Sequence, residues 1–180
     1  LVEAAGKLSQ NRRGALMVVD LGSDLRPEDF LYSGINIEAQ LSTDLLINLF
    51  ATDTPLHDGA VLVKGDKIIS AGVILPLSRQ GISRYGTRHL AALGITERFD
   101  RCICIVVSEE TGTLSLANQG KLERPITSSR LQELLNEFIG NINTPVVAKS
   151  SANRNVSSPK KSTTDIIPNI AIDKSLRNPD

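Results

Sequence analysis

The chain has 180 residues, in which 20 Lys and Arg balance 20 Asp and Glu, so its formal net charge is zero. A chain without net positive charge has no overall field to attract nucleic acid or an acidic membrane, which excludes protein classes that depend on such attraction. Aromatic residues make up only 3%. We therefore expect one domain of ordinary size whose core is built from Leu, Ile, Val and Ala.

The first half of the chain predicts strands and helices in irregular alternation. In chain order the pattern indicates a surface helix at 2–13, a strand at 15–19, a loop with a helical turn at 22–34, a short strand at Ile35 and Ile37, and a helix at 43–50 with Ser42 as its N-cap. Two β-rich runs at 60–63 and 67–75 then flank a Lys-Gly-Asp turn sequence, which predicts a β-hairpin.

The second half begins with a helix and ends with another. The expected elements are a helix from Thr87 to Leu93 closed by Gly94, a central strand from Cys102 to Val107, a strand from Thr113 to Ala117, a turn at 118–121, and a helix from Arg130 to Ile139 that starts at a Ser129–Gln132 capping box and ends at Gly140. We interpret Cys102 and Cys104 as buried, reduced thiols. This order favours an α/β fold with a twisted mixed central β-sheet flanked by helices.

Composition changes after residue 140, where Ser, Asn, Lys and Pro replace the hydrophobic pattern. We therefore predict a domain at 1–140 and a flexible polar tail at 141–180. The chain contains no signal peptide and no apolar stretch near the roughly 20 residues that cross a bilayer.

The first polar cluster that could carry chemistry runs from Pro55 to Ala60 and joins a helix to a buried strand. Asp58 and His57 are residue types that bind metal ions. Gly59 allows backbone to approach a ligand because it has no Cβ atom. The alternative is an ordinary loop in which Asp58 satisfies backbone donors.

The second cluster is Gly86-Thr87-Arg88-His89, at the start of a predicted helix. With Thr87 as N-cap, Arg88 and His89 fall in the first turn, where cations oppose the helix dipole unless an anion compensates. Free backbone N–H groups, the dipole and an arginine together favour a phosphate site. The alternative is that Arg88 pairs with a surface carboxylate.

The third cluster, Ser108-Glu109-Glu110-Thr111-Gly112, follows the central strand directly. The carboxyl end of such a strand is a common ligand position in α/β sheets, although charged turns after strands are also frequent. The sequence contains no P-loop and no G-x-G-x-x-G motif, so a nucleotide site would be of another type.

Taken together, four motifs occur in a recognisable order: Leu56-His57-Asp58-Gly59-Ala60-Val61, Leu75-Pro76-Leu77-Ser78, Gly86-Thr87-Arg88-His89 and Val107-Ser108-Glu109-Glu110-Thr111-Gly112. They resemble the diadenylate cyclase (DAC) domain family over about residues 14–140, most closely the branch with transmembrane helices ahead of the catalytic domain. The resemblance implies the DAC-domain fold and the condensation of two ATP molecules into cyclic di-AMP with release of two pyrophosphates.

The resemblance also implies a divalent metal cofactor (Mn²⁺ or Mg²⁺) and a homodimer whose facing subunits form the active site. Implied catalytic residues are Asp58, Arg88 and His89. Implied nucleotide-binding residues are Gly59, Ala60, Leu75, Pro76, Thr87, Arg88, Ser108 and Glu109, and implied metal ligands are His57, Asp58 and Glu110. No nucleic acid partner is expected. Membrane contact is expected only through helices absent from this chain, which places the domain in the cytoplasm at the inner face of the membrane.

Position 90 departs from the family pattern, which usually has Arg-His-Arg where this chain has Arg88, His89 and Leu90. Two hypotheses of different class follow. The chain is an active diadenylate cyclase, or it is a non-catalytic ATP-binding regulatory module of the same fold. A purely structural partner-binding domain would leave all three polar clusters as coincidence.

Overall fold

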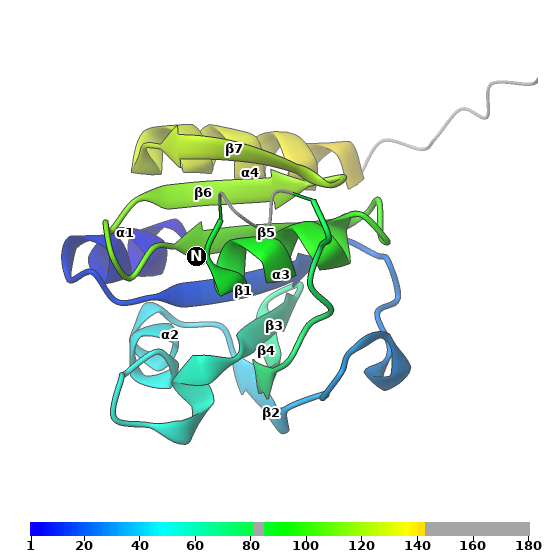
Figure 1. The fold of residues 1–180 in the computed structure, drawn as a ribbon, viewed down its shortest axis with the longest axis horizontal. Coiled ribbons are helices and arrows are strands. Elements are labelled where there is room, and N and C mark those ends of the chain that lie inside the picture. The colour runs from blue at the N-terminus through cyan, green and yellow to red at the C-terminus, as the bar shows by residue number, and fades with distance from the viewer. Residues whose placement is uncertain (81–84, 143–180) are drawn as a thin grey trace, which may run out of the picture. The chain divides into compact units, whose positions relative to one another are not determined.

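The computed structural model describes residues 1–80 and 85–142, in which the strands form one seven-stranded sheet of order β2-β4-β3-β1-β5-β6-β7 (Figure 1). The strands are β1 (Ala15–Asp20), β2 (Ile35–Gln40), β3 (Ala60–Lys64), β4 (Lys67–Val73), β5 (Cys102–Val107), β6 (Leu114–Asn118) and β7 (Lys121–Ile126). Only the β1–β3 pair is parallel among the neighbours in this sheet. The predicted mixed central sheet is therefore confirmed.

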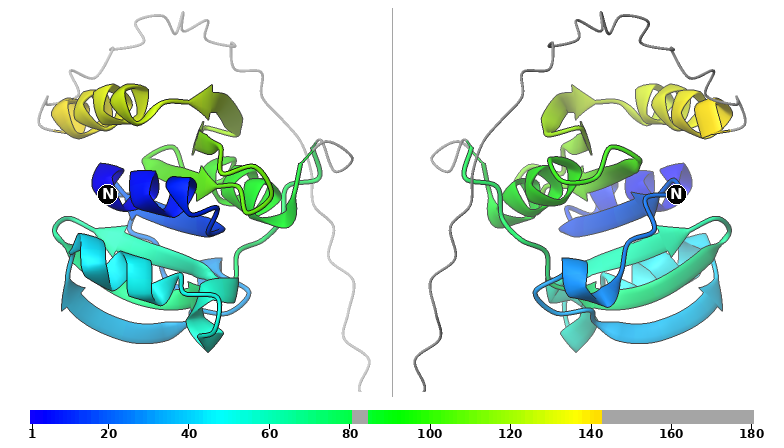
Figure 2. Two further views of the ribbon diagram at one scale, coloured as in Figure 1. Left: turned by 90° about the vertical axis from the view of Figure 1, so that its left-hand side faces the viewer. Right: turned by 90° about the vertical axis from the view of Figure 1, so that its right-hand side faces the viewer.

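Helices cover both faces of the sheet, as the edge-on views of Figure 2 show. They are α1 (Val2–Gln10), α2 (Thr43–Leu49), α3 (Thr87–Thr96) and α4 (Ser128–Ile142), with short 3₁₀ turns η1 (Pro27–Asp29) and η2 (Pro55–Asp58). Helices α1, α2 and α4 share one hydrophobic cluster with Met17 of β1, whereas α3 packs with Leu16 and Val18 on the other side. Successive side chains of a strand point to opposite faces, so one strand serves both clusters.

Strand β5 is buried along its whole length, which confirms the prediction of a central strand from Cys102 to Val107. Both cysteines are buried and free. Burial raises the pKa of the Cys104 thiol well above its ordinary value, and its neighbour Cys102 adds to this effect. These two thiols therefore act as small apolar side chains of the core.

Helix α3 differs from the prediction at both ends. Its N-cap is Gly86, without a side-chain cap hydrogen bond, so Thr87 is the first helical residue and not the cap. The helix also continues through Gly94 to Thr96. A Cβ atom at Gly94 would lie 2.1 Å from the Pro76 carbonyl oxygen. This glycine therefore serves close packing of the helix against the preceding loop, and the prediction that it ends the helix is wrong.

Helix α4 begins earlier and ends later than predicted, at Ser128 and Ile142. The side chain of Thr127 accepts a hydrogen bond from the Arg130 backbone N–H at 3.1 Å, which replaces the predicted cap at Ser129. Gly140 does not end the helix, because a glycine inside a helix lowers its stability without breaking it. Of the tail predicted at 141–180, residues 141 and 142 belong to helix α4, and residues 143–180 lie outside the described residues.

Two further elements differ from the sequence-based expectation. Helix α1 stops at Gln10 and not at residue 13. Strand β7 was not predicted, because its charged side chains and Pro125 hide the alternating pattern. Proline is tolerated there because β7 is an edge strand, paired only with β6. No helix among residues 1–80 and 85–142 has the length and hydropathy of a membrane span.

Candidate functional site

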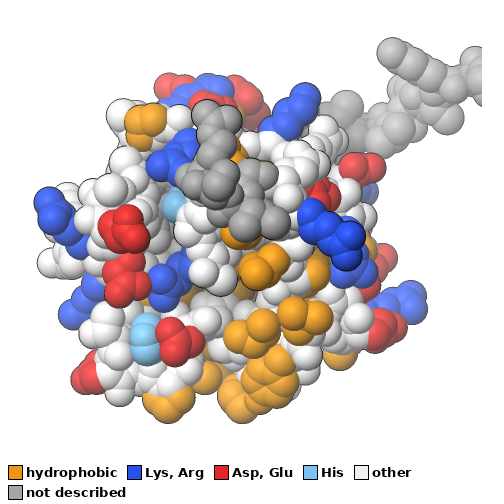
Figure 3. All heavy atoms as spheres, viewed as in Figure 1, with side chains coloured by type: hydrophobic (Ala, Val, Ile, Leu, Met, Phe, Trp, Pro, Cys, Tyr) orange, Lys and Arg blue, Asp and Glu red, His pale blue; other side chains and the backbone are white. Residues whose placement is uncertain are grey.

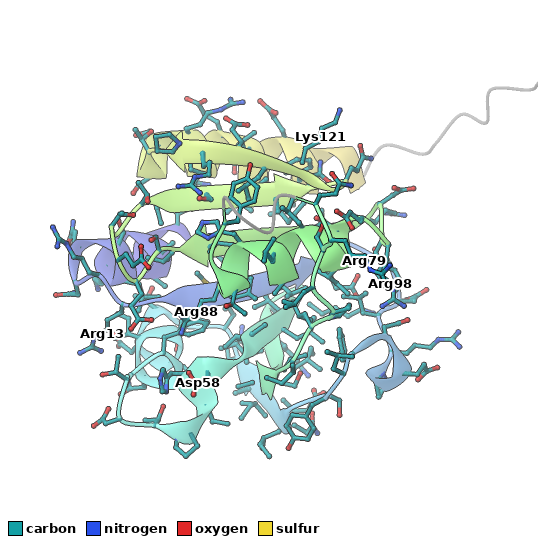
Figure 4. All side chains as sticks on the ribbon, in the orientation of Figure 1. Arg13, Asp58, Arg79, Arg88, Arg98 and Lys121 are labelled. Atoms are coloured by element: carbon teal, nitrogen blue, oxygen red, sulfur yellow. The ribbon has the colours of Figure 1, made fainter. Side chains whose placement is uncertain are left out.

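The three polar clusters of the sequence meet at one edge of the sheet. Strands β1 and β3 begin at this edge and β5 ends there, because β1 runs parallel to β3 and antiparallel to β5, with Ala15 opposite Val107. The amino ends of two strands and the carboxyl end of a third thus bring Asp58 and Ser108 to the same side of the molecule. Helix α3 also begins here, so Arg88 lies close above Asp58 in Figure 4.

An ion pair joins the second cluster to the third. Arg88 Nη1 lies 2.9 Å from Glu109 Oε2, and Arg88 Nη2 donates a longer bond of 3.5 Å to the His57 carbonyl oxygen. Arg88 pairs with a carboxylate, as the alternative interpretation requires, but this carboxylate belongs to Glu109 of the third cluster. Arg88 thus contacts residues of both other clusters.

Gly14, the residue before β1, makes room for this ion pair. A Cβ atom at Gly14 would lie 2.5 Å from Arg88 Nη1 and 2.8 Å from Glu109 Oε2. No local pattern in the sequence indicates this role, because the two side chains come from residues more than seventy positions further along the chain.

His57 and Asp58 form a pair on η2. The Nε2 atom of His57 lies 3.3 Å from Asp58 Oδ1, and the other ring nitrogen, Nδ1, contacts the Thr54 carbonyl oxygen. Because a carbonyl oxygen only accepts, Nδ1 is the donor in its contact with Thr54, and this contact orients the ring with Nε2 toward the Asp58 carboxylate. A histidine held in this way by a backbone carbonyl is the usual arrangement of a metal ligand.

A charged cavity of about 510 Å³ lies beside Arg88. It is lined by Gly86, Thr87, Arg88, His89, Val107, Ser108, Glu109, Glu110, Thr111 and Arg124. The first turn of α3 opens onto it, and its N-cap Gly86 supplies no side-chain acceptor for the free N–H groups. The cavity therefore combines a helix N-terminus with two arginines, a combination that suits an anion.

His89 forms a buried wall of this cavity, with 7% of its surface exposed. Its Nε2 lies 3.3 Å from Ser115 Oγ. Burial lowers the pKa of His89 below its ordinary value, and the positive charge of Arg124 lowers it further. The imidazole is therefore neutral near pH 7 and can exchange one hydrogen bond with Ser115.

A smaller, mainly apolar pocket of about 120 Å³ adjoins the charged cavity. It is lined by Leu16, Asp58, Gly59, Ala60, Val73, Ile74, Leu75, Leu77, Thr87, Arg88 and Ala91. Thr87 and Arg88 line both pockets. Pro76 lines neither, and its carbonyl faces Gly94 instead. Figure 3 shows this face of the molecule. Charged side chains lie on its left and along its right margin, and hydrophobic side chains lie between them, from the centre to the lower edge.

The bare Cα of Gly59 faces protein backbone. A Cβ atom there would lie 2.3 Å from the carbonyl carbon of Gly72 and 2.7 Å from the Val73 nitrogen on β4. The close approach that the sequence analysis expected at Gly59 thus exists, but the structure shows it with strand β4. The pocket lining still includes Gly59.

The predicted metal ligands are not all brought together. His57 and Asp58 are adjacent, whereas Glu110 lies on the wall of the charged cavity. Among residues 1–80 and 85–142, no group of three His, Cys, Asp or Glu side chains is placed to hold a metal ion. A pair of ligands still suits Mg²⁺ or Mn²⁺, which commonly complete their shell with water and substrate phosphates.

Four further residues lie around the site, and no local pattern in the sequence indicates them. Gly14 lies beside the ion pair, Ser115 contacts His89, Tyr85 stacks on His89, and Arg124 lines the charged cavity. Arg124 was hidden because strand β7 itself was not predicted.

Comparison with known proteins identifies the family. Residues 2–122 match the DAC family, described as "DisA bacterial checkpoint controller nucleotide-binding". The chain is 45% identical over 141 residues to a diadenylate cyclase of Listeria monocytogenes, covering 75% of this chain and 50% of that protein. It is 42% identical over 137 residues to the cyclic di-AMP synthase CdaA of Bacillus subtilis, covering 75% of this chain and 49% of that one.

The crystal structure of DacA from Staphylococcus aureus has the same fold. It superimposes with a TM-score of 0.69 at 38% sequence identity, covering 77% of this chain and 91% of that one. The chain spans about half the length of the curated relatives it matches. The resemblance seen in the four sequence motifs is thereby confirmed, and the chain belongs to the diadenylate cyclase (DAC) domain family.

Proposed function

We propose that this chain is the catalytic domain of a diadenylate cyclase, which joins two ATP molecules into cyclic di-AMP and releases two pyrophosphates. The observation that carries the proposal is that an apolar pocket and a charged cavity share Thr87 and Arg88, with Asp58 on the wall of the first. A nucleotide likewise consists of an apolar base at one end and a charged phosphate chain at the other, which matches an apolar pocket next to a charged cavity. Relatives named diadenylate cyclase support this assignment.

In the proposed complex, the adenine base lies against Leu75 and Ala60, and the backbone at Gly59 borders it. Thr87, Arg88, Ser108 and Glu109 hold the ribose and the triphosphate. The free N–H groups of the α3 N-terminus and the guanidinium of Arg88 offset the phosphate charge. Transfer of a phosphoryl-type group depends on such positioning and charge neutralisation more than on covalent chemistry.

Asp58 is the proposed catalytic carboxylate. Its side chain is 81% exposed, so in a single subunit it faces solvent and is free to meet a nucleotide held by a facing subunit. There it would accept the proton of the attacking 3′-hydroxyl. Neutral His89 would hold the start of α3 in place through Ser115 while Arg88 binds phosphate.

The pair of His57 and Asp58 would hold a divalent metal, and water and substrate phosphates would complete its coordination shell. When bound, Mn²⁺ or Mg²⁺ would neutralise phosphate charge and polarise the phosphorus centre. The orientation of His57, with Nδ1 on the Thr54 carbonyl oxygen and Nε2 3.3 Å from Asp58 Oδ1, supports this assignment.

Joining two identical nucleotides through two identical bonds requires two half-sites related by a two-fold axis. We therefore propose that residues 1–140 act as a homodimer during catalysis, and that a single subunit binds ATP without turning it over. In a longer protein of the membrane-anchored branch, this domain would lie on the cytoplasmic side of the membrane.

Product analysis tests the proposal. The protein is incubated with ATP and Mn²⁺ or Mg²⁺ over a series of protein concentrations, and cyclic di-AMP and pyrophosphate are quantified. We expect cyclic di-AMP, a specific activity that rises with protein concentration, and loss of activity on chelation of the metal. Binding of ATP without product at any concentration would instead favour the non-catalytic ATP-binding module.

A further inference from the structure

Arg124 lines the charged cavity but lies outside the four sequence motifs. It belongs to edge strand β7, and its guanidinium carbon lies 5.6 Å from the centre of the Tyr85 ring. The Tyr85 ring in turn stacks on His89, with ring centres 6.3 Å apart and an angle of 29° between the planes. A guanidinium over an aromatic face is attracted by the ring, so this stack holds the charge of Arg124 at the cavity.

No described carboxylate forms an ion pair with Arg124, and Glu110, which lines the same cavity, forms none with it. The cavity contains two arginines, and the other one, Arg88, is paired with Glu109 at 2.9 Å. Glu123, next to Arg124 in sequence, pairs with Arg130 at 3.0 Å. Alternate side chains of a strand point to opposite faces, which separates Glu123 from Arg124. Among residues 1–80 and 85–142, Arg124 forms no ion pair.

The positive charge of Arg124 also affects the pKa of His89 inside the site. It is the second cause, after burial, of the lowered pKa of His89. Leu90, which stands where the family usually has arginine, is only 7% exposed and lines neither pocket. Position 90 therefore contributes no cation to the cavity, and the cation beyond Arg88 comes from β7.

We propose that Arg124 is a second phosphate-binding residue of the site, which grips the outer phosphates of a nucleoside triphosphate while Arg88 and the α3 N-terminus bind the inner ones. This inference rests on the proposed function. It predicts that Arg124 gives the site its preference for ATP over AMP, because AMP lacks the outer phosphates. A charge-assisted hydrogen bond from guanidinium to phosphate supplies both affinity and orientation.

The test compares equilibrium binding of ATP and of AMP to the wild-type protein and to three variants. Arg124→Gln removes the charge, Arg124→Lys keeps the charge without the planar fork, and Lys121→Gln is the control. Lys121 lies on the same strand but lines a different groove. We expect Arg124→Gln to weaken ATP binding by about 10- to 100-fold while AMP binding hardly changes. Arg124→Lys should be intermediate, and Lys121→Gln should resemble the wild type.

Unchanged ATP affinity in Arg124→Gln would overturn the inference, and so would equal losses for ATP and AMP, which would indicate a merely structural role. The proposed function is judged separately, by cyclic di-AMP formation in the wild-type protein. If the wild type binds ATP without product, the proposed reaction is wrong while the ATP-to-AMP ratio still tests Arg124. If the wild type does not bind ATP, both proposals are wrong.

Discussion

Arg88 Nη1 lies 2.9 Å from Glu109 Oε2, and both atoms lie over the bare Cα of Gly14. This contact ties together the start of β1, the start of α3 and the turn after β5. The guanidinium has five N–H donors, of which one is directed at the Glu109 carboxylate and one, in a longer bond, at the His57 carbonyl oxygen, so the others remain available to a ligand. The pair therefore orients Arg88 without consuming its binding capacity.

Replacing Gly14 by alanine should disturb this orientation. The new methyl group would lie within 2.8 Å of both Arg88 Nη1 and Glu109 Oε2, so at least one of the two side chains must move. Displacement of a positioning group by about 1 Å can reduce activity by roughly 100-fold. We expect a loss of that order in kcat/KM for cyclic di-AMP formation.

The fold should tolerate Gly14→Ala, because the displaced atoms are ends of side chains at the edge of the sheet. We expect the free energy of unfolding to fall by about 1 kcal/mol, the lower end of the usual cost of overpacking. Denaturant titration measures this. Wild-type activity in a normally folded Gly14→Ala protein would show that the position of Arg88 is not important.

The Asp58→Asn substitution should reduce catalysis without destabilising the fold. Loss of a catalytic carboxylate should reduce the rate of cyclic di-AMP formation by about 100- to 10,000-fold. Because the Asp58 side chain is 81% exposed, we expect the free energy of unfolding to change by no more than about 0.5 kcal/mol. Asp53→Asn, an exposed residue of the same loop that lines neither pocket, is the matched control. Full activity in Asp58→Asn would contradict the proposed role.

Two of the glycines inside helices, Gly94 and Gly140, predict opposite responses to alanine. At Gly94 a Cβ atom would lie 2.1 Å from the Pro76 carbonyl oxygen and 2.7 Å from the Ser78 nitrogen, so Gly94→Ala should destabilise the fold by about 1–3 kcal/mol. A Cβ atom at Gly140 would meet no described atom within 4 Å outside its own stretch of helix, so Gly140→Ala should stabilise helix α4 by up to about 1 kcal/mol. Thermal denaturation of both variants measures the difference. Stabilisation by both would show that α3 can move away from the loop.

The buried His89 predicts a dependence of stability on pH. Its pKa is lowered in the folded protein, first by burial and then by Arg124, so the unfolded chain binds a proton more readily. The stability linked to this group is therefore complete above the unfolded pKa of about 6.5 and is lost as pH falls from there toward the folded pKa.

The measurement is the free energy of unfolding of the wild type and of His89→Gln, as a function of pH from neutral downward. Glutamine can still form a hydrogen bond with Ser115 but does not titrate. We expect the advantage of the wild type over the variant to shrink as pH falls below about 6.5. A constant difference over that range would contradict the shifted pKa of His89.

Much of the fold follows from local patterns in the sequence. The predictions that are wrong have a common cause, which is contact between segments distant in sequence. Short stretches of sequence predict the central strand Cys102–Val107 and the Ser42 cap of α2, and both predictions are confirmed. The Ser42 side chain accepts a hydrogen bond from the Leu45 N–H. The prediction of a helix end at Gly94 is wrong because the glycine is needed for close contact with Pro76, which is distant in sequence and therefore absent from any local pattern. Strand β7 was missed because pairing with β6, and not its own composition, makes it a strand.

The same division applies to the site. Contiguous stretches of the sequence supply the residue types of the site, namely Asp58 with His57, Arg88 with His89, and Ser108 with Glu109. Their meeting is a property of the fold, because one parallel and one antiparallel pairing of β1 place two strand starts and one strand end at the same edge. The tertiary structure also adds Gly14 and Arg124, whose roles arise from contacts across the fold that no local pattern encodes.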